Sequence, residues 1–203
     1  SRGLGDVYKR QKFTTGKGRY TDDINRPGQL HAFFIRSNVA HAKIKDIDIT
    51  KALKSDGVAA IYTGADIAAD GVGGPICGWT PTNRDGSAPK EPPHPLLANG
   101  KVRYVGDHIA VVIAESMEQA KSAAETVKID LEALAPVVDL STAIGNTQIH
   151  DEMDDNVYFD WELGDEKATA DALGSAAKVI ELTVTNNRVI PNAMEPRAAV
   201  AEY

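Results

Sequence analysis

Residues 71–100 differ in composition from the rest of the sequence. They contain six of the chain's ten prolines, and their apolar residues follow neither a helical nor a strand period. A long irregular segment inside a compact domain is usually functional, interfacial or disordered. We favour the interface interpretation, and we expect the regular structure to lie before and after this segment.

Before this segment, short apolar runs separated by turn residues predict a set of strands. The run at 30–36 is rich in aromatic and aliphatic residues, and the run at 42–48 alternates apolar and polar residues as a half-buried strand does. The expected elements are strands at 30–36, 42–48 and 58–63, a short helix from Thr50 as its cap to Leu53, and a helix or turn at 64–67.

After this segment, residues 102–114 predict either two short strands around Gly106 or one bulged strand. Ser116 and Gln119 have the spacing of a capping box, in which the first residue caps a helix and the second reaches back to it. The predicted helix has a face of small apolar residues that suits close packing on a sheet. It extends to about the start of a further strand at 127–131.

A polar, acidic stretch at 148–156 precedes a second set of expected elements. Strands are predicted at 157–161 and 179–184, and a helix at 166–175 has acidic residues in its first turn, as the helix dipole prefers. A last strand is expected within 187–203. Strands and helices are mixed without a regular βαβ order, so the expected fold class is α+β.

Both ends of the sequence predict boundaries that are not native. Residues 6–11 correspond to one translated frame of a common sequencing adapter, so we expect residues 1–11 to be a non-native leader. The run at 187–203 stops inside the strand that it predicts, whereas native chains usually end on a solvated segment. We therefore expect a fragment whose chemistry lies beyond Tyr203.

The composition is that of a folded globular protein. The chain has 203 residues, of which 42% are hydrophobic and 25% charged, with a net charge of −7. Positive charges form no stripe, so nucleic acid is not an expected partner. No apolar run approaches the roughly 20 residues of a membrane span. Cys77 is the single cysteine, which excludes an internal disulfide and favours a cytoplasmic location.

The glycines at 16 and 18 do not predict a phosphate-binding loop. The dinucleotide pattern requires a third glycine where Thr21 stands, and no strand is expected before it. A structural turn is expected instead. Asp22 and Asp23 are paired carboxylates, but neighbouring side chains of an extended chain point to opposite faces. We therefore expect a turn or cap role for them rather than a shared proton.

The histidines do not predict a metal site, because none has the spacing of a helical ligand pair or of a His-Glu-x-x-His motif. Packing or surface roles are expected for His31, His41, His94, His108 and His150. Cys77 lies in the proline-rich segment near Trp79, and the sequence shows no base that could activate its thiol. It is not expected to be a nucleophile.

The segment Glu195-Pro196-Arg197 is the best local candidate for a functional site. Proline favours an extended Glu195, which places Glu195 and Arg197 on one face of a strand. Two interpretations remain open: an ion pair inside a sheet, or a place that lines a cofactor or substrate channel. We assign no catalytic, cofactor-binding or metal-binding residue from the sequence.

Four segments in order give the sequence a resemblance to a known family. They are 16–24, 30–44, 94–107 and 192–197, the last with the letters Asn-Ala-Met-Glu-Pro-Arg. Their order and spacing resemble the large, molybdenum-binding subunit of the xanthine dehydrogenase/aldehyde oxidase family, and most of all the subunits of the carbon monoxide dehydrogenase type. The resemblance covers the chain from about residue 12 onward.

The resemblance implies an α/β-hammerhead domain at 12–140 and an incomplete start of a molybdopterin-binding domain at 141–203. It implies a cytoplasmic oxidoreductase that hydroxylates an aldehyde or an N-heterocycle, or oxidises carbon monoxide, with water as the oxygen source. The implied cofactor is molybdenum with molybdopterin cytosine dinucleotide. FAD and 2Fe–2S clusters would sit on a medium and a small partner subunit, in a dimer of heterotrimers.

The family's pterin-binding glycine loops and its base glutamate are expected beyond Tyr203, so the fragment alone is expected to be inactive. An alternative hypothesis is a free-standing hammerhead module that binds or scaffolds without catalysis. A nucleotide-dependent enzyme is disfavoured because the phosphate loop is missing.

Overall fold

The computed structural model describes residues 11–153, 155–187, 189–190, 192 and 197–202. Contacts divide the chain into two compact units, Leu30–Gly164 and a second unit formed by Ser1–Gln29 with Asp165–Tyr203. The first unit holds two three-stranded sheets and two short α-helices, which makes it an α+β structure as the sequence predicts.

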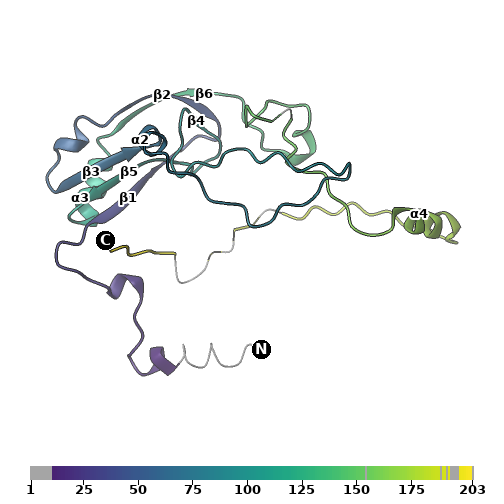
Figure 1. The fold of residues 1–203 in the computed structure, drawn as a ribbon, viewed down its shortest axis with the longest axis horizontal. Helices are drawn as coiled ribbons and strands as arrows, with labels where there is room; N and C mark the ends of the chain where they lie inside the picture. The colour runs from purple at the N-terminus through teal and green to yellow at the C-terminus, as the bar shows by residue number, and fades with distance from the viewer. Residues whose placement is uncertain (1–10, 154, 188, 191, 193–196, 203) are drawn as a thin grey trace. The chain divides into compact units, whose positions relative to one another are not determined.

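The first sheet has the strand order β1-β5-β3 and is antiparallel throughout (Figure 1). Its strands are β1 (His31–Arg36), β5 (His108–Ala114) and β3 (Val58–Thr63). The central strand β5 pairs Val112 with Phe33 on one side and with Ile61 on the other. Three strands with one apolar face are about the smallest sheet that is stable in water, provided that this face is covered.

Helix α3 (Met117–Ala124) covers that face and packs against all three strands. Its N-cap is Ser116, whose Oγ accepts a hydrogen bond from the backbone N–H of Gln119 at 3.2 Å, as the sequence predicts. The helix ends earlier than expected, because three-residue turn bonds replace the α-helical pattern after Ala124. The core beneath it consists of Ala52, Ile61, Val112, Ala114, Ala120 and Ala123.

The second sheet has the order β4-β2-β6 and is also antiparallel. Its strands are β4 (Lys101–Val102), β2 (Ala42–Asp48) and β6 (Lys128–Ala133). Ala42 and Val102 from this sheet are fully buried in a second core with Ala98 and Ile109. Since Ile109 belongs to β5, this one strand contributes to both cores.

Residues 102–114 contain parts of two separate strands rather than one bulged strand. The two strands, β4 and β5, belong to different sheets. Asp107 shapes the link between them, because its Oδ2 accepts a hydrogen bond from the Arg103 N–H at 3.0 Å.

The helix expected from Thr50 is a single 3₁₀ turn, η2 (Ala52–Lys54), and Thr50 does not cap it. The Thr50 N–H instead donates to Asp48 Oδ1 at 2.9 Å. The short helix α2 (Gly64–Ala69) begins where it is expected.

Residues 71–100 contain no helix or strand, as their composition predicts. The strand predicted at 157–161 is wrong, because this stretch makes individual hydrogen bonds with residues 83–84 and no ladder. A single 3₁₀ turn, η3 (Leu140–Thr142), is the regular structure described between β6 and residue 164.

The second unit contains helix α4 (Glu166–Ser175) at the predicted bounds and a 3₁₀ turn, η1 (Thr21–Asp23). Asp165 caps α4, because its Oδ1 accepts from the Ala168 N–H at 2.8 Å. The strand predicted at 179–184 is wrong, since these residues form no ladder and their apolar side chains are exposed. The described part of 187–203 likewise contains no strand.

Candidate functional site

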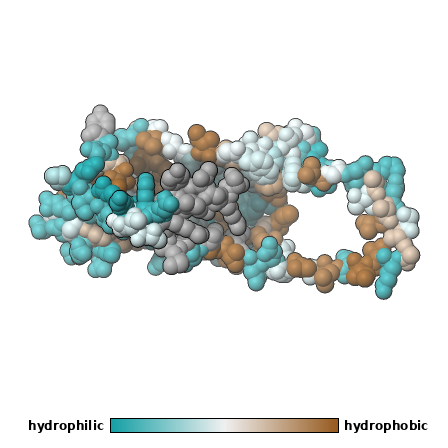
Figure 2. All heavy atoms as spheres, turned by 90° about the horizontal axis from the view of Figure 1, so that it is seen from below, coloured by the Kyte–Doolittle hydropathy of each residue, from teal (hydrophilic) through white to brown (hydrophobic). Residues whose placement is uncertain are grey.

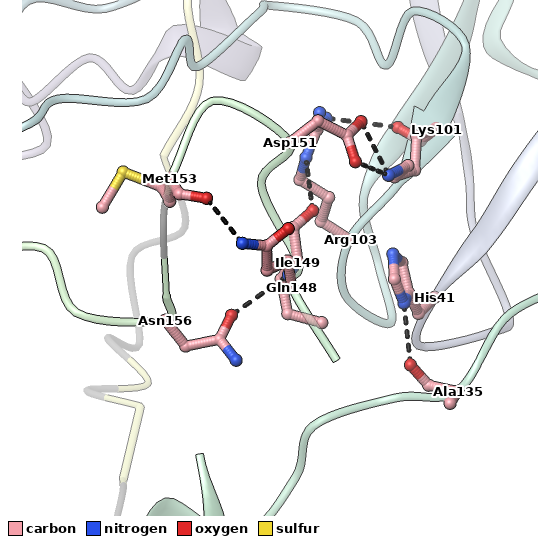
Figure 3. Close-up of polar contacts among 9 residues, drawn as sticks. All are labelled: His41, Lys101, Arg103, Ala135, Gln148, Ile149, Asp151, Met153 and Asn156. Atoms are coloured by element: carbon pink, nitrogen blue, oxygen red, sulfur yellow. Dashed lines mark hydrogen bonds and ion pairs between the residues drawn. The ribbon is translucent and has the colours of Figure 1, made fainter. Parts of the chain in front are cut away.

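A polar network fastens the acidic stretch 148–156 to the second sheet (Figure 3). Lys101 on β4 extends its Nζ to both oxygens of Asp151, at 2.7 and 2.8 Å. The Lys101 side chain is only 12% exposed, whereas that of Asp151 is 69% exposed. The hydrogen bond from Lys101 lowers the pKa of the Asp151 carboxyl, so this ion pair persists across neutral pH.

Arg103 makes the second attachment, directly after β4. Its Nε donates to the carbonyl oxygen of Ile149 at 3.3 Å, and its Nη1 donates to the carbonyl of Lys101 at 3.5 Å. A guanidinium suits this task because its fixed fork of donors satisfies two acceptors at once. We refer to Lys101, Arg103 and Asp151 as the clamp.

Inside the stretch, Asn156 bonds to three backbone groups. Its Oδ1 accepts from the Ile149 N–H at 3.1 Å, and its Nδ2 donates to the carbonyls of Ala143 and Thr147, each at 2.9 Å. The side chain of Met153 is buried. The loop therefore has a defined shape although it contains no regular element, because side-chain amides replace backbone partners.

His41 lies near the clamp in Figure 3 and is 3% exposed. Its Nδ1 is 2.8 Å from the carbonyl oxygen of Ala135, just after β6. A carbonyl can only accept, so the proton of a neutral ring sits on Nδ1. Nε2 is then an acceptor, and it is buried with no hydrogen-bond partner among the described residues. The role in packing that the sequence predicts fits this arrangement.

The other four histidines lie on different strands or loops. His108 on β5 packs against Phe34 with ring centroids 4.9 Å apart, and burial followed by the charge of Arg36 lowers its pKa. Burial followed by the charge of Arg103 lowers the pKa of His150. His31 is on β1, and His94 lies in the proline-rich segment. Among the residues that the structure describes, no three His, Cys, Asp or Glu side chains gather as metal ligands.

The proline-rich segment borders two hollows. One of about 510 Å³ lies between residues 83–90 and 153–160, and one of about 640 Å³ lies between residues 72–76, 91–99 and Arg103. Both are open to solvent. Cys77 is exposed, and its Sγ lies 3.0 Å from the carbonyl oxygen of Trp79. This contact does not test the prediction that Cys77 is not a nucleophile, which stays a prediction.

The remaining sequence candidates fall in the second unit. Gly16 has a φ of +68° and forms a turn, and the ring of Phe13 leaves no room for a side chain at Gly18. Asp23 accepts from the Tyr20 N–H at 2.8 Å and so caps η1, as predicted. Glu195 and Pro196 lie outside the described residues, so the two interpretations of Glu195-Pro196-Arg197 remain open.

The clamp cannot be recognised in the sequence. Lys101 and Arg103 stand out in a motif of the family resemblance, yet nothing in their spacing points to Asp151, which follows 50 residues later. The one sequence signal for this contact is charge, because two cationic residues at a strand end precede a stretch rich in carboxylates.

Comparison with known proteins gives consistent results. The family model for the a/b hammerhead domain of aldehyde oxidase and xanthine dehydrogenase matches residues 15–135. The nicotine 6-hydroxylase large subunit of Paenarthrobacter nicotinovorans is 35% identical over 95% of this chain and 23% of its own length. The carbon monoxide dehydrogenase large chain of Afipia carboxidovorans is 34% identical over 98% of this chain and 25% of its own.

Solved structures give the same result for the fold. A Cu,Mo-CO dehydrogenase in its carbon monoxide reduced state superposes with a TM-score of 0.68 at 30% identity, covering 83% of this chain and 22% of that one. Quinoline 2-oxidoreductase from Pseudomonas putida 86 superposes with a TM-score of 0.61 at 33% identity, covering 72% and 18%. The chain thus spans about a quarter or less of the length of these relatives.

Proposed function

The chain belongs to the aldehyde oxidase and xanthine dehydrogenase family through its a/b hammerhead domain, and from this premise we propose that it is the amino-terminal part of the large subunit of a molybdenum hydroxylase. The observation that supports this most is the alignment of 95% or more of the chain with large subunits of two such enzymes. Within it, residues 12–140 form the hammerhead domain and 141–203 begin a molybdopterin-binding domain.

The proposed reaction of the whole protein is a two-electron oxidation in which water supplies the oxygen atom. The relatives carry the names of different substrates, including nicotine, carbon monoxide and quinoline. These names support the reaction class and do not select one substrate for this chain. An aldehyde, an N-heterocycle and carbon monoxide all remain within the proposal.

The proposed cofactor of the whole subunit is molybdenum with molybdopterin cytosine dinucleotide. FAD and 2Fe–2S clusters are placed on a medium and a small partner subunit, in a dimer of heterotrimers located in the cytoplasm. Relatives named as a large subunit, as a large chain and as subunit gamma of a complex support a multi-subunit enzyme. No helix of the described residues is both long and apolar enough to cross a membrane.

The described residues do not themselves fit a molybdenum or pterin site. Among them, no three His, Cys, Asp or Glu side chains gather as metal ligands, and His41, His108 and His150 each have one buried ring nitrogen without a hydrogen-bond partner. We therefore derive no chemical step from these residues. Their contribution is structural: two small sheets, and the clamp that directs the chain from the second sheet into 148–164.

The test is to produce the complete large subunit together with the proteins encoded beside it, and to measure metal content and dye reduction. We expect about one molybdenum per large subunit, and reduction of an artificial electron acceptor by at least one aldehyde, N-heterocycle or carbon monoxide. A well-folded complete protein without molybdenum would overturn the proposal and favour the scaffolding module.

A further inference from the structure

Asn99 and Gly100 form the one Asn-Gly pair of the sequence, directly before β4. Both residues are exposed, and Asn99 borders the open hollow between residues 72–76, 91–99 and Arg103. Among the residues that the structure describes, none forms a hydrogen bond with the Asn99 side-chain amide or with the Gly100 N–H. The side-chain carbon of Asn99 and the backbone nitrogen that follows it are therefore both free to react.

Exposure alone does not single out Asn99, because Figure 2 shows both hydrophilic residues, in teal, and hydrophobic residues, in brown, at the surface that it draws. Its unbonded amide does, since other asparagine amides are held. Asn83 Nδ2 donates to Ser87 Oγ at 3.0 Å, and Asn83 Oδ1 accepts from the Asp160 N–H at 3.0 Å. The Asn156 amide bonds to three backbone groups. Each bond that must break first should slow a reaction of the amide by about two- to tenfold.

Gly100 leaves its backbone nitrogen accessible. A side chain on this residue would crowd the approach of its nitrogen to the Asn99 carbon, and glycine has none. Its φ of +73° lies in the left-handed region that glycine adopts without strain. The chain on both sides is anchored, because the Ala98 N–H donates to the His108 carbonyl at 2.6 Å and the Gly100 carbonyl accepts from the Ile44 N–H at 2.9 Å. The reactive pair is thus held at the surface between two fixed points.

We propose that Asn99 is a site of spontaneous covalent modification, at which its side chain closes a ring on Gly100 and the ring then opens to aspartate and isoaspartate. The Gly100 nitrogen loses its proton and bonds to the Asn99 Cγ, while the Cγ–Nδ2 bond breaks and ammonia leaves. Water then adds to one of the two carbonyl carbons of the succinimide ring, and the bond from that carbon to the Gly100 nitrogen breaks. Attack at Cγ gives aspartate, and attack at the main-chain carbon gives isoaspartate.

Isoaspartate lengthens the backbone by a methylene group directly before β4, because the chain then runs through the former side chain. Strand β4 is bridged to β2 by the pairs Ala42 with Val102 and Lys43 with Lys101. Lys101 also binds Asp151. The modification therefore acts at the entrance to the strand that carries part of the clamp, and its product is a substrate for enzymes that methylate isoaspartyl carboxylates. This inference does not depend on the proposed function.

The first test follows the conversion of Asn99 in the full-length protein at mildly alkaline pH, once folded and once unfolded in urea. Peptide mass spectrometry and enzymatic methylation of isoaspartate measure the rate, and Asn99→Gln gives the background. We expect the folded rate to lie within about tenfold of the unfolded rate, because only the hydrogen bond between the Ile44 N–H and the Gly100 carbonyl has to yield. A larger slowdown in the folded protein overturns the proposal.

The second test uses Val157→Gly, which creates an Asn-Gly pair whose asparagine, Asn156, has a hydrogen-bonded amide. Val157 is 40% exposed, and the three bonds of the Asn156 amide go to other residues. In urea, the two pairs should react at similar rates. In the folded variant, Asn99 should react at least about tenfold faster than Asn156, because the three bonds must break first. Equal rates in the folded variant would overturn the proposal that the free amide makes Asn99 the site. If the variant does not fold, the first test on the unaltered protein still decides.

Discussion

The second sheet and residues 179–184 have the same kind of sequence and opposite outcomes. Strand β2 alternates apolar and polar residues, and pairing with β4 and β6 buries its apolar side, with Ala42 at 0% exposure. Residues 179–184 alternate in the same way, yet Ile180, Leu182 and Val184 are 79, 80 and 75% exposed. Alternation therefore makes a segment able to form a strand. The strand forms only when a neighbouring strand pairs with its backbone N–H and C=O groups.

The same substitution at one buried and one exposed isoleucine tests this comparison. Ile109→Ala removes a side chain that is 1% exposed and joins β5 to the second core. We expect it to lower the free energy of unfolding by about 2–5 kcal/mol, because it leaves a cavity. Ile180→Ala should change it by less than about 0.5 kcal/mol. Urea unfolding followed by circular dichroism measures both, and similar losses would show that 179–184 is packed.

Glycine-to-alanine changes should have opposite signs in the two regions. A Cβ at Gly64 would lie 2.3 Å from the Ala98 carbonyl oxygen, so Gly64→Ala should cost about 1–3 kcal/mol through overpacking. Gly174, in α4, has open space around it. Gly174→Ala should raise the helicity of α4, by up to about 1 kcal/mol of local stability. Urea unfolding measures the effect of Gly64→Ala, and the helical circular dichroism signal measures that of Gly174→Ala. A stabilising effect of Gly64→Ala would contradict the close packing.

Helix caps provide a smaller test of the same contrast. Ser116→Ala removes the cap of α3, which covers the first sheet, and should lower global stability by about 1 kcal/mol. Asp165→Ala removes the cap of α4, whose residues are all exposed. It should reduce helical signal near 166–175 without moving the unfolding midpoint of the sheets. If Asp165→Ala lowered the unfolding midpoint of the sheets as Ser116→Ala does, the two units would unfold together.

The clamp predicts a local effect that depends on pH. The folded pKa of Asp151 is lowered, so the stability it contributes is present above its unfolded pKa and disappears as the pH falls through the folded value. Asp151→Asn should speed amide hydrogen exchange at 148–156 at neutral pH. The difference from the unaltered chain should vanish in acid, where both side chains are uncharged. A difference that persists in acid would assign the effect to shape rather than charge.

Much of the double-sheet fold could be predicted from the sequence, because its signals are local. The bounds of β2, β3 and α4 agree with the sequence patterns, and Ser116 is the cap that its motif indicates. The strands predicted at 157–161 and 179–184 are wrong because periodicity does not reveal whether a pairing strand exists. The Lys101–Asp151 ion pair and the contact of Trp79 with Phe159 could not be predicted, since each joins residues at least 50 positions apart through contacts without a period.

Sequencing the source DNA beyond codon 203 tests most directly whether this chain is part of a molybdenum hydroxylase large subunit. We expect the reading frame to continue for several hundred codons and to encode the glycine-rich loops that bind the pterin. A stop codon directly after codon 203, or a long frame without those loops, would contradict it.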